Sequence, residues 1–332
     1  MDVSHCREAL KNFAGKRVLV IGDLMLDEHI WGTVGRISPE APVMVVEVDS
    51  SAPDFRPGGA ANVANNIRAL GAEASVVGVI GDDEGGRILL QCLEDKGVDT
   101  SGVLVDSSRP TTRKTRIWAS HRHQVVRVDR EAKHKIPATL TRQMVSAIED
   151  RVATADAVLL SDYAKGVINR ETAQAAVQIA NEFDKPSVSN PKPCNLSCFV
   201  GVGIVTLNQS EASVASGIDI SDSSDVERAG RKLLAAVRCR GLVITRGAHG
   251  LTVFDDSGKA HHIPAIESEV YDVAGAGDTV VSALTLAIAS GLSLTEAGVI
   301  ANCSGGAVVR KVGVATTNLE EIASLLGDLR FE

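Results

Sequence analysis

The chain alternates short, continuous apolar runs with stretches of helical periodicity, and this alternation limits its fold more than any other feature of the sequence. The apolar runs have the length of strands and lie at 17–23, 75–81, 157–162, 203–208 and 241–247. Helical patterns lie at 60–70, 84–96 and 170–182, with a further one after 208. Strands that are apolar throughout belong to parallel sheets with helices on both faces. The sequence therefore predicts an α/β fold with a doubly wound, mostly parallel sheet.

Two segments interrupt this alternation. Residues 28–49 and 112–130 have the pattern of strands joined by turns, without a helix between them. They predict a small antiparallel sheet that projects from the main body as a lid. The chain has no internal repeat and no linker rich in Pro, Gly or Ser. We therefore expect one domain over 1–332, into which the two lid segments are inserted.

The composition favours chemistry on a small molecule. The formal net charge is −8, whereas proteins that bind nucleic acid usually carry a basic excess. No apolar run approaches the roughly 18 to 20 residues that span a bilayer, and the start of the chain lacks the apolar core of a signal peptide. We therefore expect a cytoplasmic protein that acts on a small molecule, with no nucleic acid and no membrane among its partners.

A glycine-rich turn at 271–289, with the sequence YDVAGAGDTVVSALTLAIA, places one acid at the start of a long apolar run. Gly275 and Gly277 permit backbone conformations in which successive N–H groups point at one anion, and the positive end of the helix dipole adds to that potential. Asp278 would repel a resting phosphate there unless it takes a proton from an attacking hydroxyl. This arrangement suits a kinase, although the turn alone is equally consistent with an ordinary helix start.

The segment DVAGAGD closely resembles the DTxGAGD signature of the PfkB/ribokinase family of sugar kinases. Other family motifs follow in the expected order along the chain: GGAANVANNIRALGA at 58–72 is similar to the N-terminal glycine-rich motif, NQSE at 208–211 matches the NxxE motif, and TRGAHG at 245–250 resembles the nucleotide-side TxGxxG turn. The resemblance implies a ribokinase-like fold and a sugar kinase that uses ATP and Mg²⁺.

Within that family, residues from about 12 to about 327 resemble the kinases that phosphorylate D-glycero-D-manno-heptose 7-phosphate at O1 to give the 1,7-bisphosphate, a step in the synthesis of ADP-heptose for the lipopolysaccharide core. Asn190 stands where those kinases usually have aspartate. The chain also stops at Glu332, before the nucleotidyltransferase domain of the bifunctional forms. The alternatives are a family kinase for another sugar, such as fructose 1-phosphate or ribose, and a sugar or nucleotide sensor without catalytic activity.

The resemblance implies a role for each motif residue. Asp278 is the expected catalytic base. The catalytic turn also includes Gly275, Ala276 and Gly277, and the N–H groups of Ala276, Gly277 and Asp278 are expected to stabilise the transferred phosphoryl group. Asn208 and Glu211 are expected to hold Mg²⁺ through its waters, although Asn and Glu at this spacing also form a helix capping box. The residues expected at the nucleotide are Thr245, Gly247, Gly250 and Asn302. Asp272 is a candidate ligand for a monovalent cation such as K⁺, although Val273 and Ala274 replace hydroxyl residues common there.

The sugar pocket is expected to contain Asp23, Asp27, Gly58, Gly59 and Asn62. A substrate with its own phosphate needs fixed cations, and the candidates are Lys165, Lys192 and, from the lid, Arg113 or Arg116. Alternatively, these cations only balance an acidic chain. Apolar lid residues, among them Val43, Val45, Val46 and Trp118, predict a homodimer formed through the lid, because exposed edge strands otherwise invite uncontrolled association.

Overall fold

A computed structural model describes residues 3–48, 53–119, 123–266, 269–311 and 313–328. Within these ranges nine strands form one large sheet, in the order β14-β13-β12-β11-β10-β9-β1-β5-β6. Their bounds are β1 Arg17–Gly22, β5 Glu73–Gly81, β6 Asp99–Asp106, β9 Ala157–Ser161, β10 Ser187–Asn190, β11 Ile204–Asn208, β12 Gly241–Thr245, β13 Leu251–Phe254 and β14 Ala260–Ile263. Every pairing from β6 to β12 is parallel, and only β13 and β14 join antiparallel. The predicted mostly parallel sheet is confirmed.

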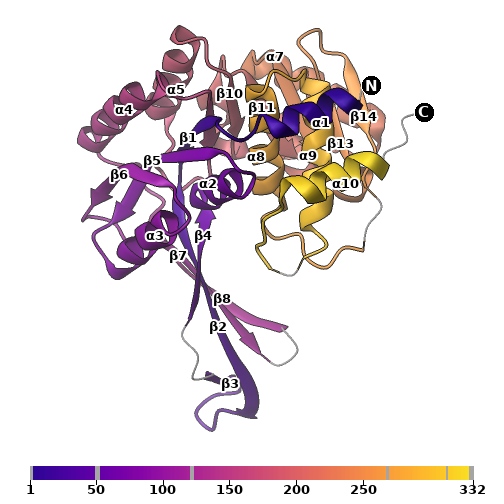
Figure 1. Cartoon of the computed structure of the whole chain (residues 1–332). Helices are drawn as coiled ribbons and strands as arrows, with labels where there is room; N and C mark the ends of the chain where they lie inside the picture. The colour runs from indigo at the N-terminus through magenta and orange to yellow at the C-terminus, as the bar shows by residue number, and fades with distance from the viewer. Residues whose placement is uncertain (1–2, 49–52, 120–122, 267–268, 312, 329–332) are drawn as a thin grey trace.

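Helices cover both faces of the large sheet (Figure 1). One face packs against α1 Val3–Lys11, α2 Ala60–Ala69, α3 Glu84–Glu94, α8 Ala276–Ala289, α9 Leu294–Val308 and α10 Leu319–Asp328. The other face packs against α4 Ala138–Val152, α5 Arg170–Glu182, α6 Gln209–Ser216 and α7 Ser223–Val237. Because side chains alternate along a strand, Val18 and Val20 of β1 lie in the first core, whereas Leu19 and Ile21 lie in the second. Both faces of the strand are therefore apolar.

A second, smaller sheet projects from this body (Figure 1). Within the described ranges it consists of β2 Leu24–Ile37, β3 Met44–Val48, β4 Asp54–Gly59, β7 Thr112–Ala119 and β8 His123–Arg130. Its pairings are antiparallel except for that between β2 and β7, which is parallel. The predicted lid sheet is thus confirmed, with one parallel pairing and with β4 as an additional strand. Residues 49 and 120–122 of the predicted lid segments lie outside the described residues.

The register of β2 and β7 decides which side chains share a face of the small sheet. Asp27 pairs with Lys114, and His29 pairs with Arg116, so these four side chains lie on one face. Farther along, the rings of Trp31 and Trp118 stack on that face with their centroids 5.4 Å apart. Glu28 and Arg113 occupy the opposite face, because each is one residue out of phase with this set.

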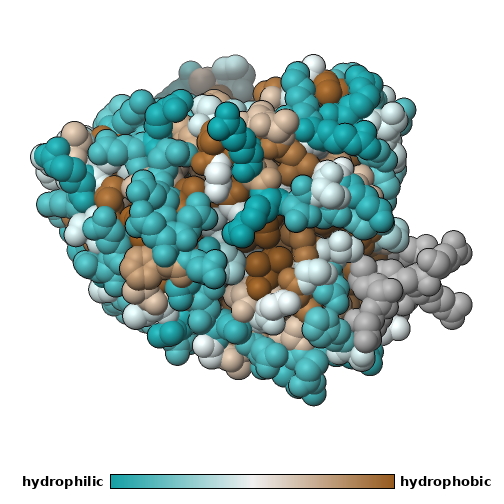
Figure 2. Space-filling model, turned by 90° about the horizontal axis from the view of Figure 1, so that it is seen from above, coloured by the Kyte–Doolittle hydropathy of each residue, from teal (hydrophilic) through white to brown (hydrophobic). Residues whose placement is uncertain are grey.

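The exterior is mainly hydrophilic on the face that Figure 2 shows, with apolar side chains gathered in a hollow near its middle. In the described part of the chain, no helix is both long enough and apolar enough to cross a bilayer.

Gly59 ends β4 and precedes α2 in a conformation that favours glycine, with φ of 57°. A Cβ atom there would lie 2.6 Å from the carbonyl oxygen of Asp23 and 3.0 Å from the side chain of Met25. We therefore expect Gly59→Ala to lower the free energy of unfolding by about 1 to 3 kcal/mol for the strained φ and by about 1 to 3 kcal/mol more for overpacking. Urea denaturation measures the loss.

Gly71→Ala is the matched control, since Gly71 has φ of 86° but no atom within 4 Å of an added Cβ. That variant should lose only the strain contribution. If Gly59→Ala is no less stable than Gly71→Ala, the close approach between β4 and the end of β1 does not constrain the fold as described.

Candidate active site

A cavity of about 300 Å³ lies where the small sheet meets the starts of α2 and α8. One wall consists of Met25, Asp27, Lys114 and Arg116 from β2 and β7. The rest of the lining is Gly59, Asn62, Tyr163, Ala274, Gly275, Gly277, Asp278 and Val314. Ligands of open parallel sheets bind beyond the carboxyl ends of the strands, and Tyr163 follows the carboxyl end of β9. The cavity therefore brings together the predicted glycine turn, the predicted sugar pocket and one face of the small sheet.

Asp278 lies in the first turn of α8, and each of its carboxylate oxygens accepts a hydrogen bond. The Asn62 amide donates to Oδ2 over 2.7 Å, and the Tyr163 hydroxyl donates to Oδ1. Burial raises the pKa of Asp278 to about 6, although the hydrogen bonds from Tyr163 and Asn62 oppose that rise. The carboxylate is thus mostly ionised at pH 7, while its pKa lies close enough to neutrality for it to accept a proton during a reaction.

The glycine turn presents fewer N–H groups to the cavity than expected. Gly275 has φ of 78° and precedes the helix as its N-cap. The N–H of Ala276 already donates to the Val273 carbonyl over 3.2 Å, so it is less able to bind a further anion. Gly277 and Asp278 occupy the first helical turn, where N–H groups have no partner within the helix. The N–H groups of Gly277 and Asp278 are therefore better able to bind an anion than the N–H group of Ala276.

Asp23 lies beneath the loop that follows β9. Its side chain is 1% exposed and does not line the cavity. Its carboxylate accepts hydrogen bonds from the backbone N–H groups of Tyr163 (2.8 Å), Lys165 (3.1 Å) and Val167 (3.2 Å). Burial raises the pKa of Asp23 to about 6 despite these bonds. The Asp23 carboxylate therefore fixes the loop after β9, and its predicted contact with the sugar stays a prediction.

The other predicted sugar-pocket residues lie at the cavity. Asp27, Gly59 and Asn62 line it. Gly58 stands beside them, and a Cβ there would lie 2.9 Å from the Asp27 carboxylate. Gly58 therefore leaves room for Asp27 to turn toward Arg116, whose Nη1 lies 2.8 Å from Asp27 Oδ1.

The predicted lid arginines lie on opposite faces of β7. Arg116 lines the cavity. Arg113 lies on the other face, where its guanidinium contacts the Glu28 carboxylate over 2.5 and 2.9 Å. Burial favours neutral Glu28, but the hydrogen bonds from Arg113 and Thr115 lower the pKa of that carboxyl. In this geometry Arg113 is paired with Glu28 on the opposite face of β7 from Arg116, and its predicted contact with the substrate stays a prediction.

Sequence reasoning missed Lys114, which lines the cavity and lies 3.5 Å from the Asp129 carboxylate. The two lysines that were predicted to hold the substrate phosphate, Lys165 and Lys192, each form an ion pair with a glutamate. Lys165 Nζ lies 2.5 Å from Glu131 Oε2. Lys192 Nζ lies 2.6 Å from Glu211 Oε1 and 5.3 Å from the centroid of the Tyr163 ring, which places it beside the cavity.

The Asn208 and Glu211 pair forms the capping box that was the alternative interpretation. The Glu211 N–H donates to Asn208 Oδ1 over 2.8 Å, and the Asn208 N–H donates to Glu211 Oε2 over 3.0 Å. Among the described residues, no group of three or more His, Cys, Asp or Glu side chains is arranged to hold a metal directly. The pair therefore suits Mg²⁺ only through water, a mode that this ion commonly uses.

Three of the four predicted nucleotide residues, Thr245, Gly247 and Gly250, lie at the carboxyl end of β12 and in the turn after it. Asn208 at the end of β11 pairs in register with Thr245 at the end of β12. The turn that follows contains Gly247 and Gly250, with φ of 56° and 75°, and the Arg246 N–H donates to the Gly250 carbonyl over 2.7 Å. Asn302 of α9 is buried and donates to the Pro264 carbonyl over 2.8 Å.

Asp272 joins two loops beside the glycine turn. Its carboxylate accepts hydrogen bonds from the N–H groups of Ala274 (2.9 Å) and Gly313 (3.0 Å). Val314, the neighbour of Gly313, lines the cavity. Asp272 thus shapes the loops that border the cavity.

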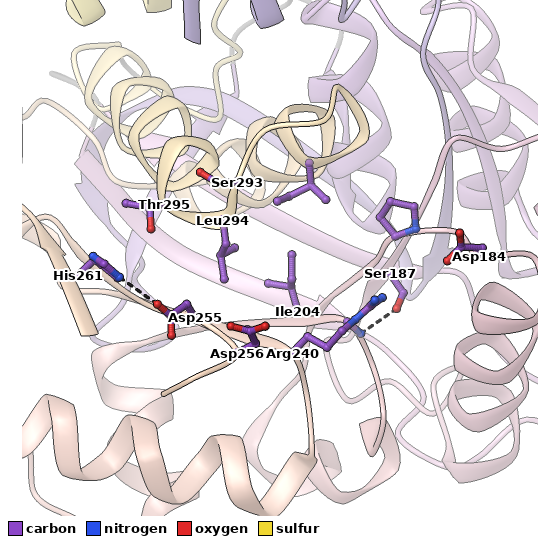
Figure 3. A pocket seen from close by; sticks show the side chains of 14 residues that line it. Asp184, Ser187, Ile204, Arg240, Asp255, Asp256, His261, Ser293, Leu294 and Thr295 are labelled. Carbon is purple, nitrogen blue, oxygen red and sulfur yellow. Dashed lines mark hydrogen bonds and ion pairs between the residues drawn. The ribbon is translucent and has the colours of Figure 1, made fainter. Parts of the chain in front are cut away.

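A larger cavity, of about 650 Å³, lies at the opposite ends of the strands, where β10, β11 and β12 begin. Ile204 and Leu294 lie in its middle, between Asp255 on one side and Asp184 on the other (Figure 3). None of the predicted site residues lines it. Because ligands of parallel sheets bind at the carboxyl ends of the strands, the smaller cavity around Asp278 is the candidate active site.

Known proteins resemble this chain over most of its length. Residues 16–322 match the description "pfkB family carbohydrate kinase". The "Bifunctional protein HldE" of Geobacter metallireducens is 44% identical over 309 residues, and that of Geobacter sulfurreducens is 42% identical over 321 residues. These matches cover 93% and 96% of the chain. The chain spans only 62% to 65% of the length of these two relatives.

Solved structures share the fold at low sequence identity. The Arabidopsis thaliana ribokinase complexed with ribose and ATP aligns with a TM-score of 0.74 and 18% identity, covering 94% of this chain and 99% of that chain. Phosphofructokinase-2 from Escherichia coli in complex with potassium aligns with a TM-score of 0.77 and 20% identity, covering 95% and 99%. These structures confirm the predicted fold, whereas the family match and the HldE relatives confirm the resemblance that the motifs indicated.

Proposed function

Since the chain belongs to the pfkB family of carbohydrate kinases, we propose that it transfers the γ-phosphoryl group of ATP to O1 of D-glycero-D-manno-heptose 7-phosphate. The product is the 1,7-bisphosphate, and we place this step in the cytoplasmic synthesis of ADP-heptose. The observation that carries the proposal is the partly buried carboxylate of Asp278, which faces a cavity wall that contains Lys114 and Arg116. The HldE relatives support heptose phosphate as the substrate. We treat 1–332 as a single kinase domain with the small sheet as its lid.

In the proposed reaction Asp278 takes the proton of the O1 hydroxyl as that oxygen attacks the γ-phosphorus. The bond between the γ-phosphorus and the bridging oxygen of ADP breaks, and ADP leaves with the electron pair. Charge that builds on the transferred group is stabilised by the N–H groups of Gly277 and Asp278 and by the α8 dipole. With its pKa near 6, Asp278 is ionised before the reaction and is a strong enough base to assist it.

We propose that ATP lies along the carboxyl ends of β11 and β12, against Thr245, Gly247, Gly250 and Asn302. Glu211 and Asn208 would hold Mg²⁺ through its waters, and their position at the neighbouring strand end supports this. When bound, Mg²⁺ supplies positive charge to the phosphates. Lys192 lies between Glu211 and Tyr163 and would contact the transferred phosphoryl group. Asp272 remains the candidate ligand for K⁺.

For the sugar phosphate, we propose that Asp27 and Asn62 contact hydroxyl groups and that Lys114 and Arg116 bind the 7-phosphate. Both cations line the cavity, whereas Lys165 is not part of its lining. Arginine suits a phosphate because its guanidinium donates two parallel hydrogen bonds. The guanidinium of Arg116 would then contact both the Asp27 carboxylate and the substrate phosphate.

Coupled ADP release with a panel of acceptors tests the proposal. The panel contains heptose 7-phosphate, fructose 1-phosphate, fructose 6-phosphate and ribose. We expect the highest kcat/KM with heptose 7-phosphate. A clear preference for another acceptor would identify a different family kinase, and binding of sugar and ATP without sugar-dependent turnover would identify a sensor.

We also propose that two copies associate through their small sheets. Apolar side chains there are strongly exposed, including Ile37 (60%), Val43 (56%), Val48 (60%) and Val128 (53%), while Val45, Val46 and Trp118 are only partly exposed. We expect a dimer at micromolar concentration, and we expect the double substitution Val126→Glu and Val128→Glu to yield monomers. Light scattering after gel filtration measures both.

Val214→Glu provides the control, because Val214 is 73% exposed on α6, away from the small sheet. It should leave the dimer intact. A wild-type chain that is strictly monomeric at micromolar concentration would contradict the proposed association.

A further inference from the structure

Tyr163 contacts the carboxylate of Asp278, and none of the roles assigned above to the site residues includes it. It lies in the loop after β9, lines the cavity, and donates its hydroxyl hydrogen to Asp278 Oδ1. Asn62 holds the other oxygen over 2.7 Å. A carboxylate has about four lone-pair sites, so two remain for an incoming hydroxyl. The base is thus held at both oxygens and is still able to accept a proton.

The loop that carries Tyr163 is fixed by two buried carboxylates. Asp23 accepts the N–H of Tyr163 itself over 2.8 Å. Asp162 accepts the N–H groups of Ala164 (2.8 Å) and Lys192 (2.9 Å). These hydrogen bonds fix the backbone on both sides of Tyr163, and the bond from its hydroxyl to Asp278 orients the ring. Such a phenol is held in place before any substrate arrives, which is what a positioning group needs.

We propose that Tyr163 is a positioning residue for the catalytic base, whose phenol, together with Asn62, fixes the orientation of the Asp278 carboxylate and stabilises its ionised form. No bond to Tyr163 forms or breaks in the reaction. Burial and the nearby charge of Asp278 raise the pKa of Tyr163 well above its ordinary value of 10. The phenol therefore stays protonated and acts as a donor. Its role in turnover rests on the proposed function, whereas the hydrogen bond itself does not.

The proposal makes the contribution of Tyr163 to stability depend on pH. The phenol binds ionised Asp278 more strongly than the neutral acid, so its loss should cost more above the pKa of about 6 than below it. The charged groups that face this pair are Asp27 on β2, Lys192 after β10 and Glu211 on α6. Asp23 also has a pKa of about 6, so its titration must be separated from that of Asp278.

Thermal unfolding at pH 5 and pH 8 separates the titration of Asp278 from that of Asp23. Four proteins are compared: the wild type, Tyr163→Phe, Asp278→Asn and the double variant. Tyr163→Phe is measured in the wild-type background and in the Asp278→Asn background, and the titration of Asp23 is common to both. We expect Tyr163→Phe to lower the melting temperature more at pH 8 than at pH 5 only while Asp278 is present. An equal loss at both pH values in both backgrounds would overturn the proposal, because it would show that the phenol contributes packing alone.

Turnover supplies the second readout. Tyr163→Phe keeps the ring but removes the donor, so kcat should fall roughly tenfold with little change in either KM, and the acidic limb of the pH profile should move to higher pH. Tyr271→Phe is the matched control, since Tyr271 is 64% exposed and donates to Glu269. An unshifted pH profile would overturn the proposal. If wild-type protein phosphorylates no sugar, the proposed function fails, and the unfolding experiment still decides the role of Tyr163.

Discussion

The Asp278→Asn variant should lose about 10² to 10⁴-fold in kcat, which is the usual contribution of a positioned base. The amide has the same shape as the carboxylate but cannot take the proton of the sugar hydroxyl. ATP binding should change little, because the proposed nucleotide contacts lie at Thr245 and beyond. Steady-state turnover and calorimetric titration with ATP measure the two effects. Retention of more than about a tenth of the wild-type kcat would be too small a loss for a general base.

The folded protein should tolerate this substitution. Burial raises the pKa of Asp278 from 3.8 to about 6, so the folded state binds this proton more tightly than the unfolded state does. The resulting stabilisation is fully present below pH 4 and is lost as the pH rises through about 6. At pH 8 the ionised carboxylate no longer adds this stability, and replacing it by an amide should leave the melting temperature close to that of the wild type.

The Arg116→Gln variant should raise KM for the phosphosugar by about 10- to 100-fold, because a charge-assisted contact contributes about 1.5 to 3 kcal/mol. KM for ATP should change by less than about threefold, which corresponds to less free energy than one such contact contributes. Arg116 lies on the small sheet, whereas the proposed ATP site lies at the ends of β11 and β12. Initial rates at varied sugar phosphate and varied ATP give both constants. Ribose, which carries no phosphate, should be insensitive to the change if it is accepted at all.

Arg113→Gln is the matched control on the same strand. Both arginines pair with a shielded carboxylate, since the Arg113 and Glu28 side chains are 20% and 6% exposed and those of Arg116 and Asp27 are 16% and 8% exposed. The two substitutions should therefore cost similar stability, but only Arg116→Gln should impair binding of the sugar phosphate. Equal increases in KM from both variants would remove Arg116 from the proposed phosphate site.

The main sheet could be predicted because its central strands are apolar throughout. Runs such as 157–162 are apolar on both faces, which only a covered parallel strand explains. The strands β10, β13 and β14 were not predicted, since each has only four residues. β4 was missed for another reason: its sequence DFRPGG contains Pro and two Gly residues, which ordinarily indicate a turn.

Part of the site could be predicted because it depends on residues that are neighbours in the sequence. Asp278 follows directly from the glycine turn, because its function depends on neighbours in sequence. The partners of the other residues depend on contacts between distant segments. Only the register between β2 and β7 shows that Arg116 shares a face with Asp27 while Arg113 does not. Tyr163 was missed because its contact joins residues 115 positions apart, although its place directly after a strand was a usable signal.

Phosphorus NMR of a reaction with ATP, Mg²⁺ and D-glycero-D-manno-heptose 7-phosphate tests the central claim most directly. The proposed function predicts a sugar that carries two phosphate groups, the new one coupled to the anomeric hydrogen, and its disappearance with Asp278→Asn. Release of inorganic phosphate with the sugar unchanged, or a new phosphate on a carbon other than C1, would contradict it.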